Sequence, residues 1–231
     1  MIAEKVESQF RKGIITDGER RQKEVEIWTT ATNEVTEASG GRIAFEVYPA
    51  GQLGRETISY VDSGLADIGI AVPSYESDSL PMTSVLELPG IINDACSGTA
   101  RFAALAGEGG VLYENEYRDL GVHVLYVNVL PPYALMTTSQ PVNTREDVQG
   151  LKIRANGNAM TMTASAVGAA PVPVTSSEMF DALTRGTVDG VLLAVGSAPS
   201  LDLGGVLNYM VNPIRLGQGV TFAVINQSVW D

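Results

Sequence analysis

Arg154 is the residue whose type and position best suit it to hold an anion. It follows Leu151 and Ile153, which alternate as in a strand, and it precedes the turn Ala-Asn156-Gly-Asn158. Ligands of open α/β sheets bind at the carboxyl ends of strands, and a planar guanidinium can bind both oxygens of a carboxylate. Arg154 is therefore a candidate carboxylate anchor and Asn156 a candidate neutral donor. On position alone, a surface salt bridge from Arg154 to an acid stays open.

The other reactive side chains give little sign of catalysis. The chain lacks the motifs G-x-G-x-x-G, G-x-x-x-x-G-K-[ST], H-E-x-x-H and G-x-S-x-G. Cys96 and His123 could in principle form a nucleophile–base pair, but we favour the interpretation that they are a loop thiol and a histidine on a strand. As the single cysteine and single histidine, they exclude a cysteine- or histidine-rich metal site, and we expect no cofactor. The acids Glu76 and Asp78 lie in a turn-rich segment and are predicted to be solvated.

Charge narrows the class of partner. The 231 residues include 27 acidic and 15 basic ones, which gives a net charge of −12. An acidic surface repels nucleic acid and anionic lipid, but a pocket can be locally positive, so a small anion stays possible. No stretch reaches the roughly 18 consecutive apolar residues that a membrane span needs. The first residues also lack the apolar core of a secretory signal.

The first half predicts alternating helices and strands. Thr16-Asp-Gly-Glu19 reads as a capping box that opens a helix ended by Gly40-Gly41. We predict strands over 43–47, 67–72 and 123–129, and helices over 56–62 and 99–120. The strand–helix–strand order favours a parallel sheet with crossover helices.

The second half repeats this logic after Pro131-Pro132, a predicted hinge between two lobes. We predict strands over 134–138, 151–154, 171–174, 188–195 and 220–225, a helix over 158–167, a helix capped by Ser176 or Ser177, and a helix that begins near 226. The spacing Glu56, Gly64, Asp67 recurs as Glu178, Gly186, Asp189. This predicts one equivalent helix–strand unit in each lobe, unless two ordinary junctions coincide.

Several segments, taken in order, resemble one known family. They are Ser39-Gly-Gly-Arg-Ile43, Tyr48-Pro-Ala-Gly-Gln-Leu-Gly54, Asp67-Ile-Gly69, Asp147-Val-Gln-Gly-Leu-Lys-Ile-Arg154, Gly168-Ala-Ala-Pro-Val-Pro173 and Val188-Asp-Gly190. On these segments the chain, from about residue 24 to its end, is similar to the DctP-type extracytoplasmic solute receptors of TRAP transporters. In that family the arginine of the G-L-K-I-R segment pairs with the substrate carboxylate, and Arg154 occupies that position.

The resemblance implies an α/β fold with two periplasmic-binding-protein-like lobes, a mainly parallel sheet in each, and a ligand cleft between them. We expect residues 1–127 with 216–231 in lobe 1 and 128–215 in lobe 2. The implied function is a periplasmic, monomeric receptor, not an enzyme, that delivers a small organic acid to TRAP transporter membrane subunits. Strand-end position adds four weaker candidates for the site: Tyr75, Asn128, Tyr133 and Ser197.

Three departures from the family shape these expectations. Members that bind sialic acid carry a second arginine where this chain has Ala134, so a small mono- or dicarboxylate is the expected ligand. Residues 1–18 do not resemble the family's opening strand, and the chain ends at Asp231 before the family's bracing helices. We therefore expect an incomplete or rearranged member. An enzyme or a ligand-sensing module on the same scaffold stays the alternative.

Overall fold

The computed structural model describes residues 29–30, 32–48, 52–199, 201–211 and 214–231. They fall into two compact units, residues 1–54 with 200–202 and residues 55–199 with 203–231. The predicted capping box at residues 16–19 lies outside the described residues. In the first unit, residues 32–38 are helical, and Gly40 and Gly41 adopt φ of +66° and +78°. These left-handed glycines end the helix as predicted.

The strand predicted over 43–47 does not form, because this segment pairs with no strand that the structure describes. Its apolar side chains Ile43 and Phe45 are exposed. A strand needs a neighbour for its backbone groups, and alternation in the sequence does not supply one.

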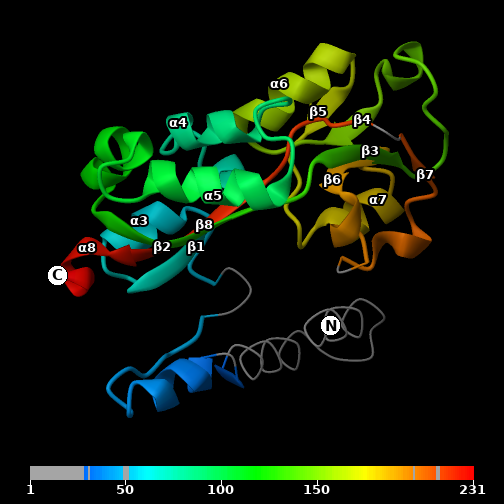
Figure 1. The fold of residues 1–231 in the computed structure, drawn as a ribbon. Coiled ribbons are helices and arrows are strands. Elements are labelled where there is room, and N and C mark those ends of the chain that lie inside the picture. Colours follow the sequence, from blue (N-terminus) through cyan, green and yellow to red (C-terminus); the bar gives the residue numbers. More distant parts are fainter. Residues whose placement is uncertain (1–28, 31, 49–51, 200, 212–213) are drawn as a thin grey trace. The chain divides into compact units, whose positions relative to one another are not determined.

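The second unit contains the remaining helices and strands (Figure 1). Its α-helices are α3 (Thr57–Asp62), α4 (Pro81–Ser84), α5 (Ala95–Ala106), α6 (Gly157–Val167), α7 (Met179–Thr184) and α8 (Gln227–Trp230). Its strands are β1 (Ile68–Ala71), β2 (Val122–Val129), β3 (Tyr133–Thr137), β4 (Lys152–Arg154), β5 (Ala170–Val172), β6 (Gly190–Ala194), β7 (Tyr209–Met210) and β8 (Val220–Asn226). Short 3-10 turns η1 (Pro73–Tyr75), η2 (Val85–Glu87) and η6 (Val195–Ser197) lie between them.

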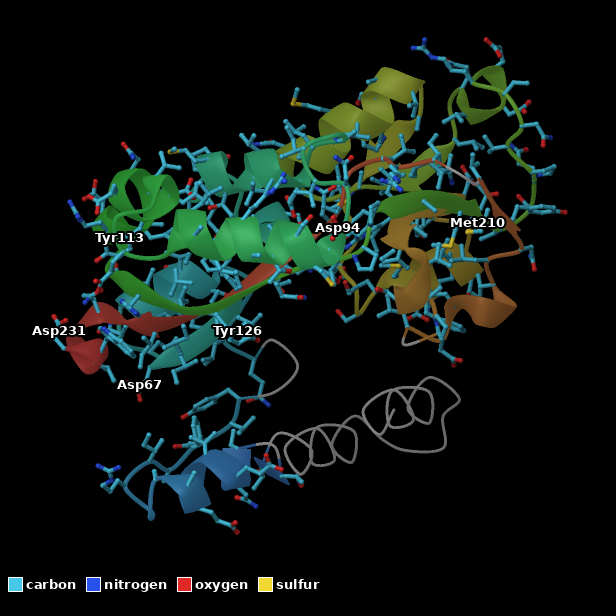
Figure 2. The ribbon with its side chains drawn as sticks, viewed as in Figure 1. Asp67, Asp94, Tyr113, Tyr126, Met210 and Asp231 are labelled. Atoms are coloured by element: carbon cyan, nitrogen blue, oxygen red, sulfur yellow. The ribbon has the colours of Figure 1, made fainter. Side chains whose placement is uncertain are left out.

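One sheet has three strands in the order β1-β8-β2, and both outer strands run antiparallel to β8. Helices α3 and α5 pack on the face that carries Phe222. The rings of Phe102, from α5, and Phe222 pack edge-on with their centroids 5.9 Å apart, and the Asn226 side chain donates from Nδ2 to the Val61 carbonyl near the end of α3. Asp94 begins α5 by accepting from the Ser97 amide at 2.8 Å (Figure 2).

The other sheet has five strands in the order β5-β4-β6-β3-β7. Strand β4 is parallel to β5 and β6, whereas β3 is antiparallel to both β6 and β7. Every residue of β3 and β6 is buried. Helices α6 and α7 lie on opposite sides of this sheet (Figure 1), so its central strands have no solvent-exposed face.

The sheets are thus mixed or antiparallel, and the prediction of a mainly parallel sheet in each lobe is wrong. In the five-stranded sheet the reason is β3, which runs antiparallel to both of its neighbours. In the three-stranded sheet the reason is β8, a strand from the end of the chain that inserts between β1 and β2. Local strand–helix–strand order could not predict this insertion, because β8 lies about 150 residues after β1. The lobe boundaries at 127/128 and 215/216 stay a prediction.

Two chain segments connect the two sheets, and these segments lie side by side. One of them is the predicted hinge at Pro131-Pro132. The Leu130 amide donates to Gly219 at 2.8 Å, and the Tyr133 amide donates to Gly217 at 2.8 Å. The connection from β2 to β3 is therefore held against the returning segment before β8. Gly217 adopts φ of +89° and its Cα faces the Glu87 carbonyl, so a side chain there would collide with the backbone.

Two further expectations need correction. The predicted helix over 99–120 stops at Ala106, because Gly107 takes an extended conformation. Residues 113–120 then form shorter π and 3-10 turns. Helix α7 is not capped by Ser176 or Ser177: its N-cap position is Glu178, whose carboxylate accepts from the Thr175 amide at 3.1 Å.

Candidate functional site

Arg154 ends β4 and is buried, with 3% of its surface exposed. Its Nε donates to the Val174 carbonyl at 2.9 Å. No carboxylate among the described residues lies within ion-pair distance of it. A buried guanidinium keeps its charge, so it favours an anionic partner strongly. The surface salt bridge considered as the alternative for Arg154 is absent from the described part of the chain.

Asn156, two residues later, is also buried and uses its side chain on the backbone. Its Nδ2 donates to the Val174 carbonyl at 2.7 Å, and its Oδ1 accepts from the Val174 amide at 2.9 Å. The pair of bonds reproduces a strand-like pairing across the turn that follows β4. Asn156 thus fixes the segment after β5 against Arg154, and within the described ranges no further acceptor is recorded for its Nδ2 group.

Tyr133 lies at the start of β3 and is also buried. Burial raises the pKa of Tyr133 above its usual value, and the charge of Arg154 opposes that rise. Glu87 and Tyr75 raise it further by their charges. The Tyr133 hydroxyl lies against the Cα of Gly219, where a side chain would displace it. Tyr133 is therefore an un-ionised phenol close to the guanidinium.

Glu87, at the end of η2, is a buried glutamate near Arg154 that was not predicted from the sequence. It is 1% exposed, and burial raises its pKa to about 8, opposed less strongly by the Val220 backbone amide and the Arg154 guanidinium. Neither carboxyl oxygen has a hydrogen-bond partner among the described residues. The position of Glu87 between Leu86 and Leu88 was the available signal, because an acid inside an apolar segment is unusual.

Tyr75, in η1, joins the site from another direction. Its hydroxyl lies 3.0 Å from the Ser176 hydroxyl and accepts from the Ser176 amide at 3.3 Å. Close by, the Ser77 hydroxyl accepts from the Asn158 amide at the start of α6 at 3.2 Å. These bonds connect the η1 region with the segments that follow β4 and β5.

The comparison with protein families decides what kind of protein carries this site. Residues 18–231 match the model of the bacterial extracellular solute-binding proteins, family 7, also called DctP. The chain belongs to this family.

The DctP relatives are distant in sequence and close in fold. A solute-binding protein of Albidiferax ferrireducens is 26% identical over 201 residues, which are 86% of this chain and 57% of that protein. A TRAP periplasmic solute-binding protein of Bordetella bronchiseptica with bound (R)- and (S)-mandelate is 27% identical, with a TM-score of 0.74 over 86% of this chain and 62% of that one. A TRAP solute-binding protein of Rhodoferax ferrireducens with copurified benzoate is 27% identical, with a TM-score of 0.72 over 89% and 63%.

This DctP chain therefore spans about three fifths of the relatives that it matches. One further similarity is short: 33 residues are 64% identical to the RNA polymerase subunit beta' of Kineococcus radiotolerans, which is 14% of this chain and 3% of that subunit. So small a share of the subunit carries no functional argument.

The remaining candidates are Asn128 and Ser197. Asn128 is exposed on β2 opposite Thr221, and Ser197 is half-buried in η6 after β6. No interaction within the described part of the chain joins either side chain to Arg154. Both stay predictions.

The other reactive groups of this DctP chain lie elsewhere. Cys96 is exposed near the start of α5, and His123 stacks on Trp230 at 4.1 Å. In the described ranges, no group of three or more His, Cys, Asp or Glu side chains could hold a metal ion. Glu76 corrects an expectation: it is buried rather than solvated. Its carboxylate accepts from the Ile58 amide at 3.1 Å, and burial raises its pKa to about 7.

Proposed function

We propose that this DctP chain is the receptor of a TRAP transporter and that it binds a small organic acid through Arg154. The observation that carries the proposal is the charge of Arg154, which is buried and has no carboxylate partner in the described residues. A buried charge without a counterion is strongly unfavourable. A ligand carboxylate would supply that counterion and could bind the two guanidinium nitrogens that Nε leaves available.

The ligand class draws support from the two structural relatives. Mandelate and benzoate are bound in those proteins, and each carries one carboxylate on an apolar body. Of the residues near Arg154, Tyr133 offers both a hydroxyl and an apolar ring. Position 134 is alanine, which argues against a larger acid sugar that needs a second guanidinium. We propose a small mono- or dicarboxylate, tested first with aromatic acids.

Partners and location follow from family membership and are proposed with it. A DctP receptor would work in the periplasm and would deliver its acid to the membrane subunits of a TRAP transporter, as a monomer. None of the helices in the described residues is both long and apolar enough to cross a membrane. An enzyme on the same scaffold is the competing reading, and a turnover assay on the acid that binds would detect it.

Binding by the Arg154→Ala variant tests the proposal. A thermal-shift screen with mandelate, benzoate, C4-dicarboxylates, 2-oxo acids and sugar acids comes first, because a ligand at about 100 times its Kd adds roughly 2.7 kcal/mol to the stability of the folded state. Calorimetry then gives the Kd of each acid that shifts the melting temperature. We expect Arg154→Ala to weaken binding by about 2–5 kcal/mol, as for a buried charge pair that loses one member.

Arg145→Ala is the matched control. Arg145 also donates to a backbone carbonyl, that of Ala166 at 2.8 Å, but it is exposed. Its removal should leave the Kd unchanged. Binding that survives Arg154→Ala with less than about a tenfold loss, or about 1.4 kcal/mol, would show that the anchor lies elsewhere. A folded chain that binds none of the acids would contradict the receptor proposal itself.

A further inference from the structure

Glu87 is a second ionisable group of the site, and its backbone is held by the returning segment before β8. The Gln218 amide donates to the Glu87 carbonyl at 3.3 Å, and the buried Gln218 side chain donates to the Leu86 carbonyl. Gly217 allows this close approach. The direction in which the Glu87 side chain leaves the backbone is therefore fixed by the same segment that connects the two sheets.

The Glu87 carboxyl is buried, lacks a hydrogen-bond partner among the described residues, and feels the charge of Arg154. A buried polar group with no partner is unfavourable in a folded protein and requires an explanation. One explanation is that its partner is a group of the bound acid. A second is that Glu87, when it ionises, becomes the counterion of Arg154.

We propose that Glu87 is a specificity-determining residue of this site: as a neutral carboxyl group it admits an organic anion to Arg154, and as a carboxylate it competes with that anion. The inference rests on the proposed function, because it concerns the same ligand. Its preferred ligands are acids with an oxygen that can accept a hydrogen bond from the neutral Glu87 O–H.

The charged and titratable groups around Glu87 favour this behaviour. They are Arg154 on β4, which is a permanent cation, and Tyr133 on β3, whose pKa Tyr75 of η1 also raises. Burial keeps Tyr133 neutral to higher pH than usual. The pKa of Glu87 is raised to about 8, and a ligand carboxylic acid is already ionised at that pH. Within this site, Glu87 is therefore the group that changes charge between pH 7 and 9.

The experiment measures the Kd of benzoate by calorimetry from pH 6 to 9. Benzoate has one carboxylate and no other polar group, so its binding reports on Arg154 and Glu87. If only the neutral form of Glu87 admits the anion, the apparent Kd scales with the inverse of the neutral fraction. The wild-type Kd should then rise roughly tenfold between pH 7 and pH 9. Repeating the titration in buffers of different ionisation enthalpy should show net proton uptake at pH 9.

Two variants locate the effect. Glu87→Gln keeps the size of the side chain and a donor but cannot ionise, so its Kd should be independent of pH over this range. Glu76→Gln is the matched control: it removes another buried glutamate with a raised pKa, one that holds the Ile58 amide of α3. It should keep the wild-type pH dependence. A wild-type Kd that stays flat, or that rises equally in Glu87→Gln, overturns the proposal.

A ligand-free measurement separates this inference from the proposed function. The folded-state pKa of Glu87 is raised to about 8, so folding favours the protonated form. The stability of the wild type should therefore fall relative to Glu87→Gln as pH rises from about 5 to about 8, and the difference should then level off. If benzoate binds neither the wild type nor Glu87→Gln, the proposed ligand class is wrong and the pH dependence of Kd gives no information on Glu87. Parallel stability curves would then overturn the titration of Glu87, and diverging curves would support it.

Discussion

The unit α3–β1 and the unit α7–β6 begin from the same local pattern and end in different surroundings. Each helix has six residues. Each is followed by a left-handed glycine, Gly64 with φ of +74° and Gly186 with φ of +70°, and then by an aspartate before the strand. The predicted equivalence of the two units is confirmed at the level of helix, turn and strand.

The two strands differ in their neighbours. Among the described strands, β1 is an edge strand that pairs only with β8, and its residues alternate between exposed and buried. β6 lies between β4 and β3 and is buried throughout. Lys152 of β4 also binds the α7–β6 unit directly, because its Nζ donates to the Gly186 carbonyl at 2.6 Å. Local sequence therefore specifies the unit, and the sheet around it decides how much of the strand is buried.

The largest expected difference is at the third residue after each aspartate. Leu192 of β6 is 1% exposed, whereas Ile70 of β1 is 38% exposed. Leu192→Ala should reduce the free energy of unfolding by about 2–5 kcal/mol, because it leaves a cavity in the core. Ile70→Ala should cost about 1 kcal/mol, since much of this side chain is already in water. Urea unfolding of both variants measures the difference, and equal losses would show that the exposed face of β1 is covered in solution.

The glycines that end the two helices should respond alike. A Cβ on Gly64 or Gly186 would meet no other atom within 4 Å, so the effect of Gly→Ala comes from the left-handed backbone alone. That conformation costs roughly 1–2 kcal/mol for an alanine. Melting temperatures should therefore fall similarly in both variants. Gly196→Ala is the control, because Gly196 is equally open but lacks a positive φ, and it should be near neutral.

How much of the fold could be predicted depends on whether the signal is local. The strands over 123–129 and 220–225 and the helix over 158–167 were predicted to within a residue or two of their observed bounds, because their apolar periodicity is strong. The insertion of β8 between β1 and β2 could not be predicted, since a pairing between distant segments leaves no trace in either segment. The segment over 43–47 shows the reverse error, because alternation indicates a strand but not its partner.

The candidate site was predictable where a side chain ends a strand. Arg154, which ends β4, was selected by that rule, Asn156 came from the turn after it, and Tyr133 came from a loop next to a strand end. In the structure, Arg154 and Asn156 both donate to the Val174 carbonyl. Glu87 was missed because it lies in a short turn, and its environment comes from Arg154 and the 216–219 segment, both far away in sequence. Glu76 was expected to be solvated for the same reason.

The smallest expected effect concerns the aspartate that opens each strand. Asp189 accepts from the Lys152 amide at 2.8 Å and lies 3.9 Å from the Lys152 ammonium, whereas Asp67 is exposed and its side chain makes no described contact. Asp189→Ala should cost about 1 kcal/mol, mainly for the lost hydrogen bond, and Asp67→Ala should stay within about 0.5 kcal/mol of the wild type. Asp189→Asn keeps an acceptor oxygen and removes the charge. Because a half-exposed ion pair contributes little, this variant should recover most of the loss in urea unfolding. Suppose instead that Asp189→Asn loses as much stability as Asp189→Ala. The charge of Asp189 would then be what holds the α7–β6 unit to β4, and the position of β6 in its sheet would depend on an electrostatic contact that β1 lacks.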